Sequence, residues 1–257
     1  MKVRSPLRYP GGKSRAIKYL VPMIEEMGIK EMVSPFFGGG HVEIACATRG
    51  IQVHGYDLFL PVVVFWQSLL KEREDLADIT GAFRGAVDKD TFLGLQRELR
   101  QGVDDPTIAA AFYYVLNRCS FSGTTLSGGY SKQAAEGRFT ESSLDRLRNF
   151  VCPNMTVRWG DFKDTLNVHP KDMFVYADPP YLIKSQNLYG SQGDLHEGFD
   201  HDKLEEILKG RTNWMLSYNN CPEILEKYKD YEILYPDWKY GMGEDKESKE
   251  LLILSKK

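Results

Sequence analysis

The sequence lacks a long apolar run. No segment approaches the ~20 consecutive apolar residues that a membrane-spanning helix needs. The longest candidate, Leu58 to Trp66, is short and is interrupted by Pro61. The opening stretch MKVRSPLRYP is charged, contains prolines and has no apolar segment behind it, so a signal peptide is not expected. We therefore expect a cytoplasmic protein with no membrane partner.

Paired cysteines are also missing. The four cysteines, at positions 46, 119, 152 and 221, lie far apart and form no CxxC pair. This spacing argues against a structural zinc site and for a reducing compartment. The five histidines are scattered, and neither His196 nor His201 has a second ligand at metal spacing. We expect no metal.

The chain has little net charge, −3 at pH 7, and so gives no overall sign of nucleic-acid binding. The first 30 residues differ, because they contain seven lysines and arginines against only two glutamates. Such a basic segment can contact phosphates, or it can be an ordinary solvated helix. Charge alone leaves both interpretations open.

The stretch RYPGGKS, from Arg8 to Ser14, looks like the end of a phosphate-binding loop, but its spacing excludes that motif. The motif needs a glycine five positions before the one that precedes the lysine, and Leu7 stands there. Only six residues precede Leu7, too few for the buried strand that the motif follows. A terminal segment with a turn is the simplest interpretation of these residues alone.

Apolar spacing predicts an α/β sheet that begins near residue 30. A helix at 15–27 and a buried strand at 30–37 lead into three glycines, after which a helix at 41–48 and a strand at 51–56 are expected. Asp57 ends this second strand. Strand, glycine turn, helix, strand and acid in this order are typical of a nucleotide-binding α/β fold.

Between residues 61 and 150 the pattern changes. Helices are expected at 69–76, 83–99 and 108–116, followed by a Ser/Gly/Thr-rich loop or exposed hairpin near 119–140. The strand pattern resumes at 155–159, 172–177, 214–218 and 251–254. We therefore predict a sheet domain, 1–60 and 151–257, interrupted by a mostly helical insertion, 61–150.

The glycine turn does not fit a dinucleotide fingerprint. Gly38 and Gly40 satisfy its first half, but Glu43 occupies the third glycine position. Asp57 follows Gly40 by 17 positions, close to the ~20 expected of an acid that binds ribose hydroxyls. An adenosine-bearing ligand remains open, and so does a strand-end aspartate that only caps a turn.

The tetrapeptide Asp178-Pro179-Pro180-Tyr181 follows an apolar strand, at the sheet edge where ligands bind in such folds. Two prolines stiffen the backbone and contribute carbonyls without N–H groups. A carboxylate and a fixed carbonyl can accept both hydrogens of an exocyclic amino group. Tyr181 offers a flat face to a planar base.

Taken together, the motifs resemble the Dam-like family of DNA adenine-N6 methyltransferases, in its alpha arrangement. They are RYPGGK, SPFFGGG, YD at 56–57, GDF at 160–162 and DPPY, in this order over nearly the whole chain. The resemblance implies a Rossmann-like methyltransferase sheet, S-adenosylmethionine as the methyl donor, and double-stranded DNA as the substrate. The insertion would recognise the target sequence. A bacterial or viral protein, monomeric or weakly dimeric, and a restriction-modification role fit this family.

The resemblance also assigns roles to residues. Tyr9 and Lys13 would contact the donor, with Lys13 paired to its methionine carboxylate, and Asp57 would hold its ribose. The remaining donor-binding positions would be Phe36, Gly38, Gly40, Asp161, Phe162 and Asp178. The target adenine would be flipped out of the duplex, stacked on Tyr181 and read by Asp178 and the Pro179 carbonyl. Independently of the resemblance, the segment 182–198 has no core pattern and is expected to be a loop over the target pocket, although a surface loop without function remains open.

Sequence readout departs from the family members that modify GATC. Their aromatic-N-G-x-x-R run corresponds here to residues 121–126, where Ser122 replaces the asparagine and Leu126 the arginine. Arginine is the usual bidentate reader of guanine, so a different target is expected. The candidates for DNA contact are Arg8, Asn117, Arg118, Ser122, Thr124 and Lys132.

Three rival functions remain. Methylation of cytosine N4 uses a similar donor site and tetrapeptide, although the tetrapeptide more often begins with serine. A catalytically silent nucleic-acid binder would not need Lys13, Asp178 and Tyr181. A protein-glutamine methyltransferase would be expected to carry asparagine at position 178 and no hairpin insertion.

Overall fold

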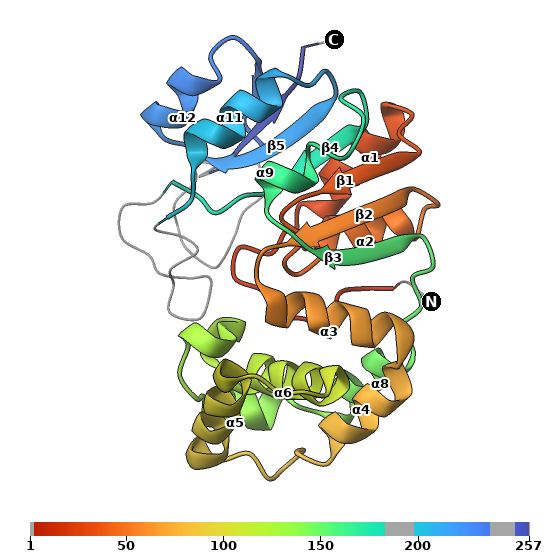
Figure 1. The fold of residues 1–257 in the computed structure, drawn as a ribbon, viewed down its shortest axis with the longest axis vertical. Helices are drawn as coiled ribbons and strands as arrows, with labels where there is room; N and C mark the ends of the chain where they lie inside the picture. The colour runs from red at the N-terminus through yellow and green to blue at the C-terminus, as the bar shows by residue number, and fades with distance from the viewer. Residues whose placement is uncertain (1–2, 183–197, 237–249, 257) are drawn as a thin grey trace.

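A seven-stranded sheet forms one half of the molecule in the computed structural model, which describes residues 3–182, 198–236 and 250–256 (Figure 1). The order of strands across the sheet is β3-β2-β1-β4-β5-β7-β6. The strands are β1 (Glu31–Ser34), β2 (Gln52–Asp57), β3 (Met155–Trp159), β4 (Phe174–Ala177), β5 (Trp214–Asn219), β6 (Glu232–Leu234) and β7 (Glu250–Leu254). The first five strands of this order run parallel, and β7 is antiparallel to both β5 and β6.

The direction of winding reverses beside β1. This strand pairs on one side with β2 and on the other with β4, so the chain crosses the sheet first one way and then the other. At such a reversal the connections leave the carboxyl ends of neighbouring strands in opposite directions and open a crevice between them. The segments that follow β1 and β4, SPFFGGG and DPPY, therefore face the same crevice.

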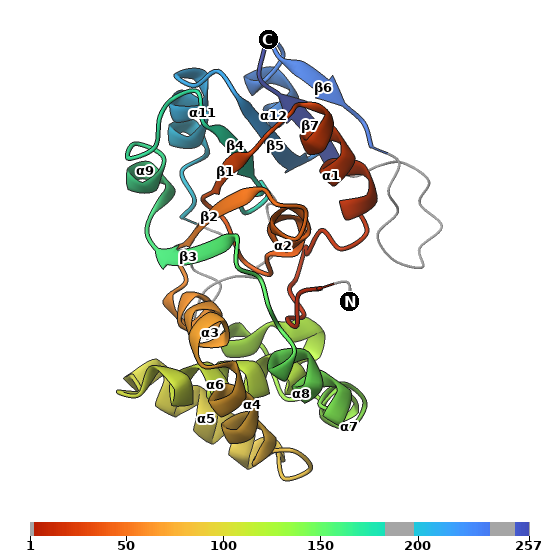
Figure 2. The same cartoon turned by 90° about the vertical axis from the view of Figure 1, so that its right-hand side faces the viewer.

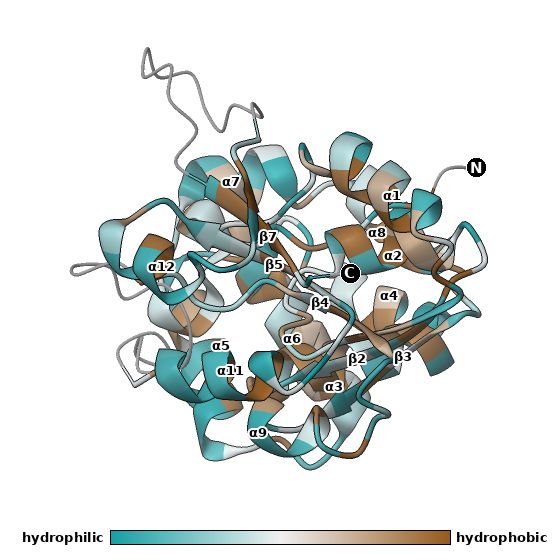
Figure 3. Ribbon diagram, turned by 90° about the horizontal axis from the view of Figure 1, so that it is seen from above, coloured by the Kyte–Doolittle hydropathy of each residue, from teal (hydrophilic) through white to brown (hydrophobic). Residues whose placement is uncertain are grey.

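Alternating residues of β1 divide the core into two layers. Met32 packs with α1 (Ile17–Glu26), α2 (His41–Ala47) and the helical insertion on one face of the sheet. Val33 packs on the other face with α9 (Phe162–Thr165), α11 (His201–Lys209) and α12 (Pro222–Lys227). All four residues of β4 are buried, as expected of a central strand covered on both sides. Hydrophobic residues accordingly concentrate along the strands (Figure 3).

Residues 60–148 form a helical half beside the sheet (Figures 1 and 2). It contains α3 (Leu60–Lys71), α4 (Arg73–Gly81), α5 (Lys89–Gln101), α6 (Pro106–Cys119), α7 (Lys132–Arg138) and α8 (Glu141–Arg148). Helix α3 contacts both β3 and α6. Its buried residues share one apolar cluster with the sheet, so the two halves have a common core along this helix.

Two of the expected helices have other boundaries. The helix expected at 69–76 is divided at Glu72 (φ −133°, ψ 42°), where α3 ends and α4 begins. Helix α3 instead begins at Leu60, because Pro61 in a first turn costs no hydrogen bond. The helix expected at 83–99 begins only at Lys89, after a turn in which Gly85 has φ 80°. Asp88 caps this start by accepting a hydrogen bond from the Thr91 amide.

A loop or hairpin was expected near 119–140, and most of this segment does not form a hairpin. Only Ser120 and Tyr130 form an antiparallel bridge among the described residues. Two short 3₁₀ turns, at 121–123 and 125–127, lie between them, and the second half is helix α7. No helix within the described ranges is long and apolar enough to cross a membrane.

A glycine on β2 leaves room for the Phe37 ring, and its substitution tests this packing. A Cβ on Gly55 would overlap the ring of Phe37, which follows β1. We expect Gly55→Ala to lower the free energy of unfolding by ~1–3 kcal/mol, because the ring and the strand must separate. The matched control is Gly94→Ala on α5, where a Cβ meets no atom within 4 Å. It should raise stability by ~0.5–1 kcal/mol. Chemical denaturation measures both, and equal effects would contradict the overlap.

Candidate active site

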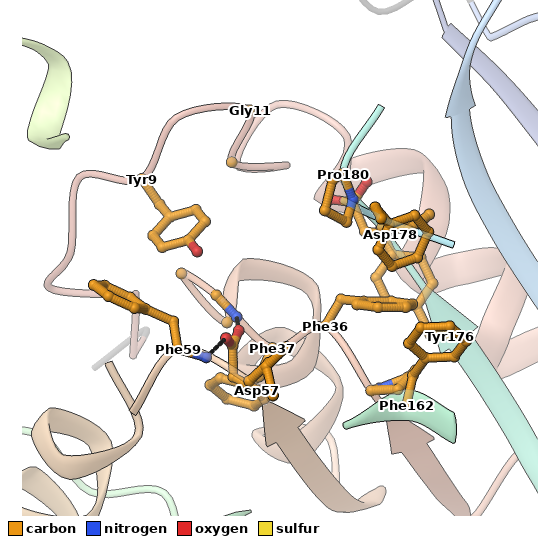
Figure 4. A pocket seen from close by; sticks show the side chains of 18 of the residues that line it. Tyr9, Gly11, Phe36, Phe37, Asp57, Phe59, Phe162, Tyr176, Asp178 and Pro180 are labelled. Atoms are coloured by element: carbon orange, nitrogen blue, oxygen red, sulfur yellow. Dashed lines mark hydrogen bonds between the residues drawn. The ribbon is translucent and has the colours of Figure 1, made fainter. Parts of the chain in front are cut away.

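A cavity of about 420 Å³ lies at the carboxyl ends of β1, β2 and β4 (Figure 4). The segment from Tyr9 to Lys13 forms part of its wall, although it is remote from these strands in sequence. The residues expected to bind a cofactor, from Tyr9 through Asp178, all line it. The cavity falls within the ~300–1,000 Å³ typical of sites for small molecules and cofactors.

The glycine turn after β1 packs against the amino-terminal segment. Gly38 has φ 45°, and a Cβ there would lie 2.7 Å from Cε1 of Tyr9. Gly40 has φ 62°, also in the left-handed region that favours glycine. From α3, the Trp66 indole N–H donates to the Gly38 carbonyl over 2.9 Å. The turn is therefore held on one side by Tyr9 and on the other by the helical half.

Asp57 joins the ends of β1 and β2. Its Oδ2 accepts a hydrogen bond from the Gly38 amide at 2.7 Å, and its Oδ1 accepts one from the Phe59 amide at 2.8 Å (Figure 4). Burial raises the pKa of this carboxyl to about 6, although both backbone amides act in the opposite direction. Asp57 thus fixes the glycine turn while it also lines the cavity.

Three aromatic rings form one wall. The ring of Phe36 lies 5.5 Å from those of both Phe162 and Phe199, and these two lie 5.2 Å apart. Asp161 caps α9 by accepting a hydrogen bond from the Lys163 amide at 2.9 Å, which places Phe162 at the cavity. Phe199 comes from the distant 198–200 segment, and no sequence motif marks it. The wall offers apolar faces to a flat ring system.

The DPPY tetrapeptide meets Lys13 at the end of β4. The Lys13 ammonium lies 2.8 Å from Oδ1 of Asp178 and 2.7 Å from the Tyr181 hydroxyl. It also lies 3.4 Å from Oε1 of Glu250 and donates to the Gly11 carbonyl over 3.2 Å. Lys13 is only 3% exposed, and its two carboxylate partners keep its pKa raised against the effect of burial. Sequence motifs indicated Lys13 and the tetrapeptide but gave no sign of Glu250.

Burial shapes the acidity of Asp178. Its pKa is raised to about 6, first by burial and then by the charge of Glu250, while Lys13 acts to lower it. Pro179 beside it is buried, and the Tyr181 ring stacks on Tyr218 with centroids 6.0 Å apart. One face of Tyr181 is therefore covered by protein, and the Lys13 ammonium lies 4.9 Å from the centroid of the same ring.

Two titratable groups on α2, the half-buried His41 and the buried Glu43, were not among the expected site residues. Burial lowers the pKa of His41 to about 4, so this ring is neutral at pH 7. Glu43 accepts a hydrogen bond from the Ser34 hydroxyl at 2.7 Å, and burial raises its pKa to about 7. In the sequence, Glu43 occupies the position where a dinucleotide fingerprint has glycine. This mismatch could have indicated Glu43 as a residue of the site. Both residues line the cavity.

Two of the residues expected to contact DNA are buried, which corrects that expectation. Asn117 is fully buried; its Oδ1 accepts from the Arg8 amide, and its Nδ2 donates to the carbonyls of Arg8 and Gly123. Arg118 is 5% exposed and donates to the carbonyls of Arg138 and Pro6. The polar atoms of both side chains form their hydrogen bonds with backbone groups inside the protein and do not face solvent. They fasten the amino-terminal segment to the insertion.

The other candidates for DNA contact lie at or near the surface. Ser122 is exposed in a left-handed conformation (φ 53°), and Lys132 is 78% exposed. Thr124 is half-buried, and Arg8 donates to the Ser120 carbonyl over 3.1 Å. The neighbouring Phe121 ring is 73% exposed, which the sequence did not single out. Phe121 and Ser122 are therefore two adjacent exposed residues of the 3₁₀ turn that follows α6.

Position 126, where readers of GATC have arginine, is buried in this protein and cannot present a side chain to DNA. The Leu126 side chain is 2% exposed and belongs to the apolar core, while its carbonyl accepts from Arg100 and Gln96. A residue at this position points away from the surface in this fold.

Among the described residues no group of three or more His, Cys, Asp and Glu could hold a metal ion. The segment expected to cover the pocket falls mostly at 183–197, outside the described residues.

Comparison with known proteins connects this geometry to a function. The family of D12 class N6 adenine-specific DNA methyltransferases matches residues 9–242. The type II methyltransferase M1.LlaDCHI of Lactococcus lactis subsp. cremoris is 23% identical over 255 residues, covering 91% of this chain and 87% of that protein. The modification methylase StsI of Streptococcus sanguinis is 25% identical over 216 residues, covering 77% of this chain but 31% of that protein.

The buried Glu43 carboxyl should make stability depend on pH. Its pKa in the folded protein is about 7, above the ordinary 4.5, so folding favours its protonated form. The contribution of this carboxyl to stability is therefore fully present below about pH 4.5, and it is lost as pH rises through about 7. Glu43→Gln removes this loss while keeping an acceptor for Ser34. We expect the variant to gain on the wild type by up to roughly 3 kcal/mol between about pH 5 and pH 8.

Urea denaturation at the two pH values measures this gain. The control is Glu74→Gln, because that side chain is 78% exposed and should change stability little at either pH. A Glu43→Gln difference that stays constant with pH would mean that Glu43 does not titrate in this range.

Proposed function

Because the chain belongs to the family of D12 class N6 adenine-specific DNA methyltransferases, we propose that its cavity binds S-adenosylmethionine beside the site where DPPY receives the target adenine. The enzyme is a DNA adenine-N6 methyltransferase. The observation that carries the proposal is that the glycine turn, Asp57 and Asp178 share one cavity at the switch point of the sheet.

The residues present fit this donor. The rings of Phe36 and Phe162 can bind an adenine face, and the buried Asp57 can accept hydrogens from ribose hydroxyls. Left-handed Gly38 and Gly40 let the backbone approach a ligand closely. Tyr9 lies over this turn. When bound, the donor supplies a methyl group on a positively charged sulfonium.

The DPPY residues prepare the target amine. Asp178 would accept one N6 hydrogen and the Pro179 carbonyl the other, which directs the nitrogen lone pair toward the methyl group. The donor, when bound, would supply the methyl group to the N6 lone pair that Asp178 and the Pro179 carbonyl orient, and its sulfur would keep the electron pair. Asp178, whose pKa is raised to about 6, can then take up the proton that N6 must lose. The half-buried Tyr181 ring, which lines the cavity, would stack on the base.

We assign Lys13 to the catalytic centre and not to the methionine carboxylate of the donor. Its ammonium has three hydrogens, and four acceptors already lie within 3.4 Å of it. A further carboxylate would have to displace one of them. Lys13 instead holds Asp178 and Tyr181 in place at the end of β4.

The insertion, residues 61–150, would recognise the DNA sequence. An adenine within a duplex must leave the stack before its N6 can reach a buried carboxylate. The exposed Phe121 and Ser122 follow Ser120, whose carbonyl accepts a hydrogen bond from Arg8, the neighbour in sequence of the cavity residue Tyr9. They would be the first candidates for contact with DNA. Lys132 and Arg138 on α7 add positive charge for phosphates. The names of the two relatives fit a role in restriction-modification.

Loss of the Asp178 carboxylate should abolish methyl transfer while DNA is still bound. Asp178→Ala removes one acceptor for the target amine, whereas phosphate contacts lie elsewhere. We expect turnover to fall by ~10²-fold or more. Transfer of labelled methyl groups from S-adenosylmethionine to DNA measures turnover, and a gel-shift titration of the same preparation measures DNA affinity. Lys171→Ala, an exposed residue ahead of β4, is the matched control. Near-normal turnover of Asp178→Ala would show that the catalytic centre is elsewhere.

The methylated sequence should contain adenine but should not be GATC. Ser122 and the buried Leu126 cannot supply the amide and guanidinium contacts of a GATC reader. Each bidentate contact is worth ~1–3 kcal/mol against the wrong base, so the target is expected to be different, shorter or more degenerate. Single-molecule sequencing of plasmid DNA from cells without their own adenine methylation, expressing this protein, identifies it. Methylation confined to GATC would contradict this expectation.

A further inference from the structure

Glu250 reaches the catalytic centre from the antiparallel side of the sheet. It is the first residue of β7, pairs in register with Asn219 of β5, and is 7% exposed. Its Oε1 accepts a hydrogen bond from the Tyr181 hydroxyl at 2.7 Å and lies 3.4 Å from the Lys13 ammonium. It therefore touches both residues that surround Asp178, without being part of any motif.

Lys13 consequently has two carboxylate partners. The ammonium is 2.8 Å from Asp178 and 3.4 Å from Glu250, and the Tyr181 hydroxyl bridges between Lys13 and Glu250. A buried ammonium that had a single carboxylate partner would bind that carboxylate tightly, because burial removes the water that would compete for it. With a second carboxylate, the electrostatic attraction of the ammonium is shared between two partners. The position of the ammonium then no longer depends on Asp178 alone.

We propose that Glu250 is a positioning residue for methyl transfer: it holds Lys13 and the Tyr181 hydroxyl, so that the Asp178 carboxylate can turn from Lys13 to the N6 amine of the target adenine. This inference rests on the proposed function of the DPPY site. Glu250 acts through Lys13 and Tyr181 and does not itself contact the base.

The charges around Asp178 give the inference a distinctive signature. Lys13 comes from the amino-terminal segment, Glu43 from α2, Tyr181 from the DPPY loop and Glu250 from β7. The negative charge of Glu250 raises the pKa of Asp178, and Lys13 lowers it. Glu250→Gln removes the first effect and, among the residues that the structure describes, leaves Asp178 as the one carboxylate within 4 Å of the Lys13 ammonium. Asp178 should then bind Lys13 more tightly and remain ionised at lower pH.

The test is steady-state methyl transfer by the full chain as a function of pH, with S-adenosylmethionine and DNA that carries the methylated sequence. Glu250→Gln should lower kcat about tenfold or more, which corresponds to ~1.4 kcal/mol in the barrier. The dissociation constant of the donor should stay within about twofold, because Glu250 is not among the residues that line the cavity. Since Asp178 must be ionised to accept the amine, the acidic limb of kcat should move to lower pH.

Two further variants separate the contributions. Tyr181→Phe removes the hydroxyl bridge but leaves the charge of Glu250, so kcat should fall without the same shift of the acidic limb. Glu232→Gln, an exposed residue on the neighbouring β6, is the matched control and should change neither quantity. Thermal unfolding of each variant shows whether it is folded, and Glu250→Asp, which keeps the charge, should restore the position of the acidic limb.

The outcomes distinguish this inference from the function on which it rests. A wild-type protein that transfers no methyl group would overturn both. Normal wild-type turnover, with Glu250→Gln unchanged in kcat and in pH profile, would overturn the role of Glu250 alone. A variant that loses donor binding in proportion to kcat would overturn it as well, because that result describes a structural residue. If Glu250→Gln does not fold, a folded Glu250→Asp whose acidic limb departs from the wild-type position would overturn it, because the charge at this position would then not set the limb.

Discussion

The burial of one ammonium group constrains the whole catalytic centre. Lys13 is 3% exposed, and a cation in that environment is stable only when anions and hydrogen-bond acceptors surround it. Its partners come from the ends of β4 and β7, so three segments that are remote in sequence must meet at one point. The amino-terminal segment is thereby bound to the sheet and forms part of the cavity wall.

The acidic groups that line the cavity outnumber this ammonium. Burial raises the pKa values of Glu43, Asp57 and Asp178, to about 7, 6 and 6. Such carboxyls are costly to keep ionised in the folded protein, which is why they rely on backbone amides, a serine hydroxyl and Lys13. The same surplus of negative charge suits a cavity proposed to receive a sulfonium ion, because the ligand itself would offset part of that cost.

Much of the sheet and of the cavity could be predicted from the sequence, because local patterns determine them. An apolar strand followed by a glycine turn, or by DPPY, fixes its own structure, and strands such as Met155–Trp159 lie where periodicity placed them. Asn117 and Arg118 were misjudged because polar side chains in the last turn of a helix, next to a small-residue loop, usually face solvent. Their partners, the carbonyls of Arg8 and Arg138, become neighbours only in the folded chain. Glu250 and Phe199 went unnoticed for the same reason: nothing in their own surroundings in the sequence marks them.

The pairing of Asn117 with Arg8 has a consequence for how the protein reaches its active form. The amide side chain bonds to both the N–H and the carbonyl of Arg8 across a separation of 109 residues, and Lys13 meets Tyr181 across 168. Contacts of such separation require the intervening chain to be ordered first, since closing a long loop costs entropy before the contact repays it. The amino-terminal segment emerges early from the ribosome but can dock only after α6 and the end of β4 have folded. Its docking is then a late step of folding, and partly folded chains with an intact sheet would still lack the wall of the cavity.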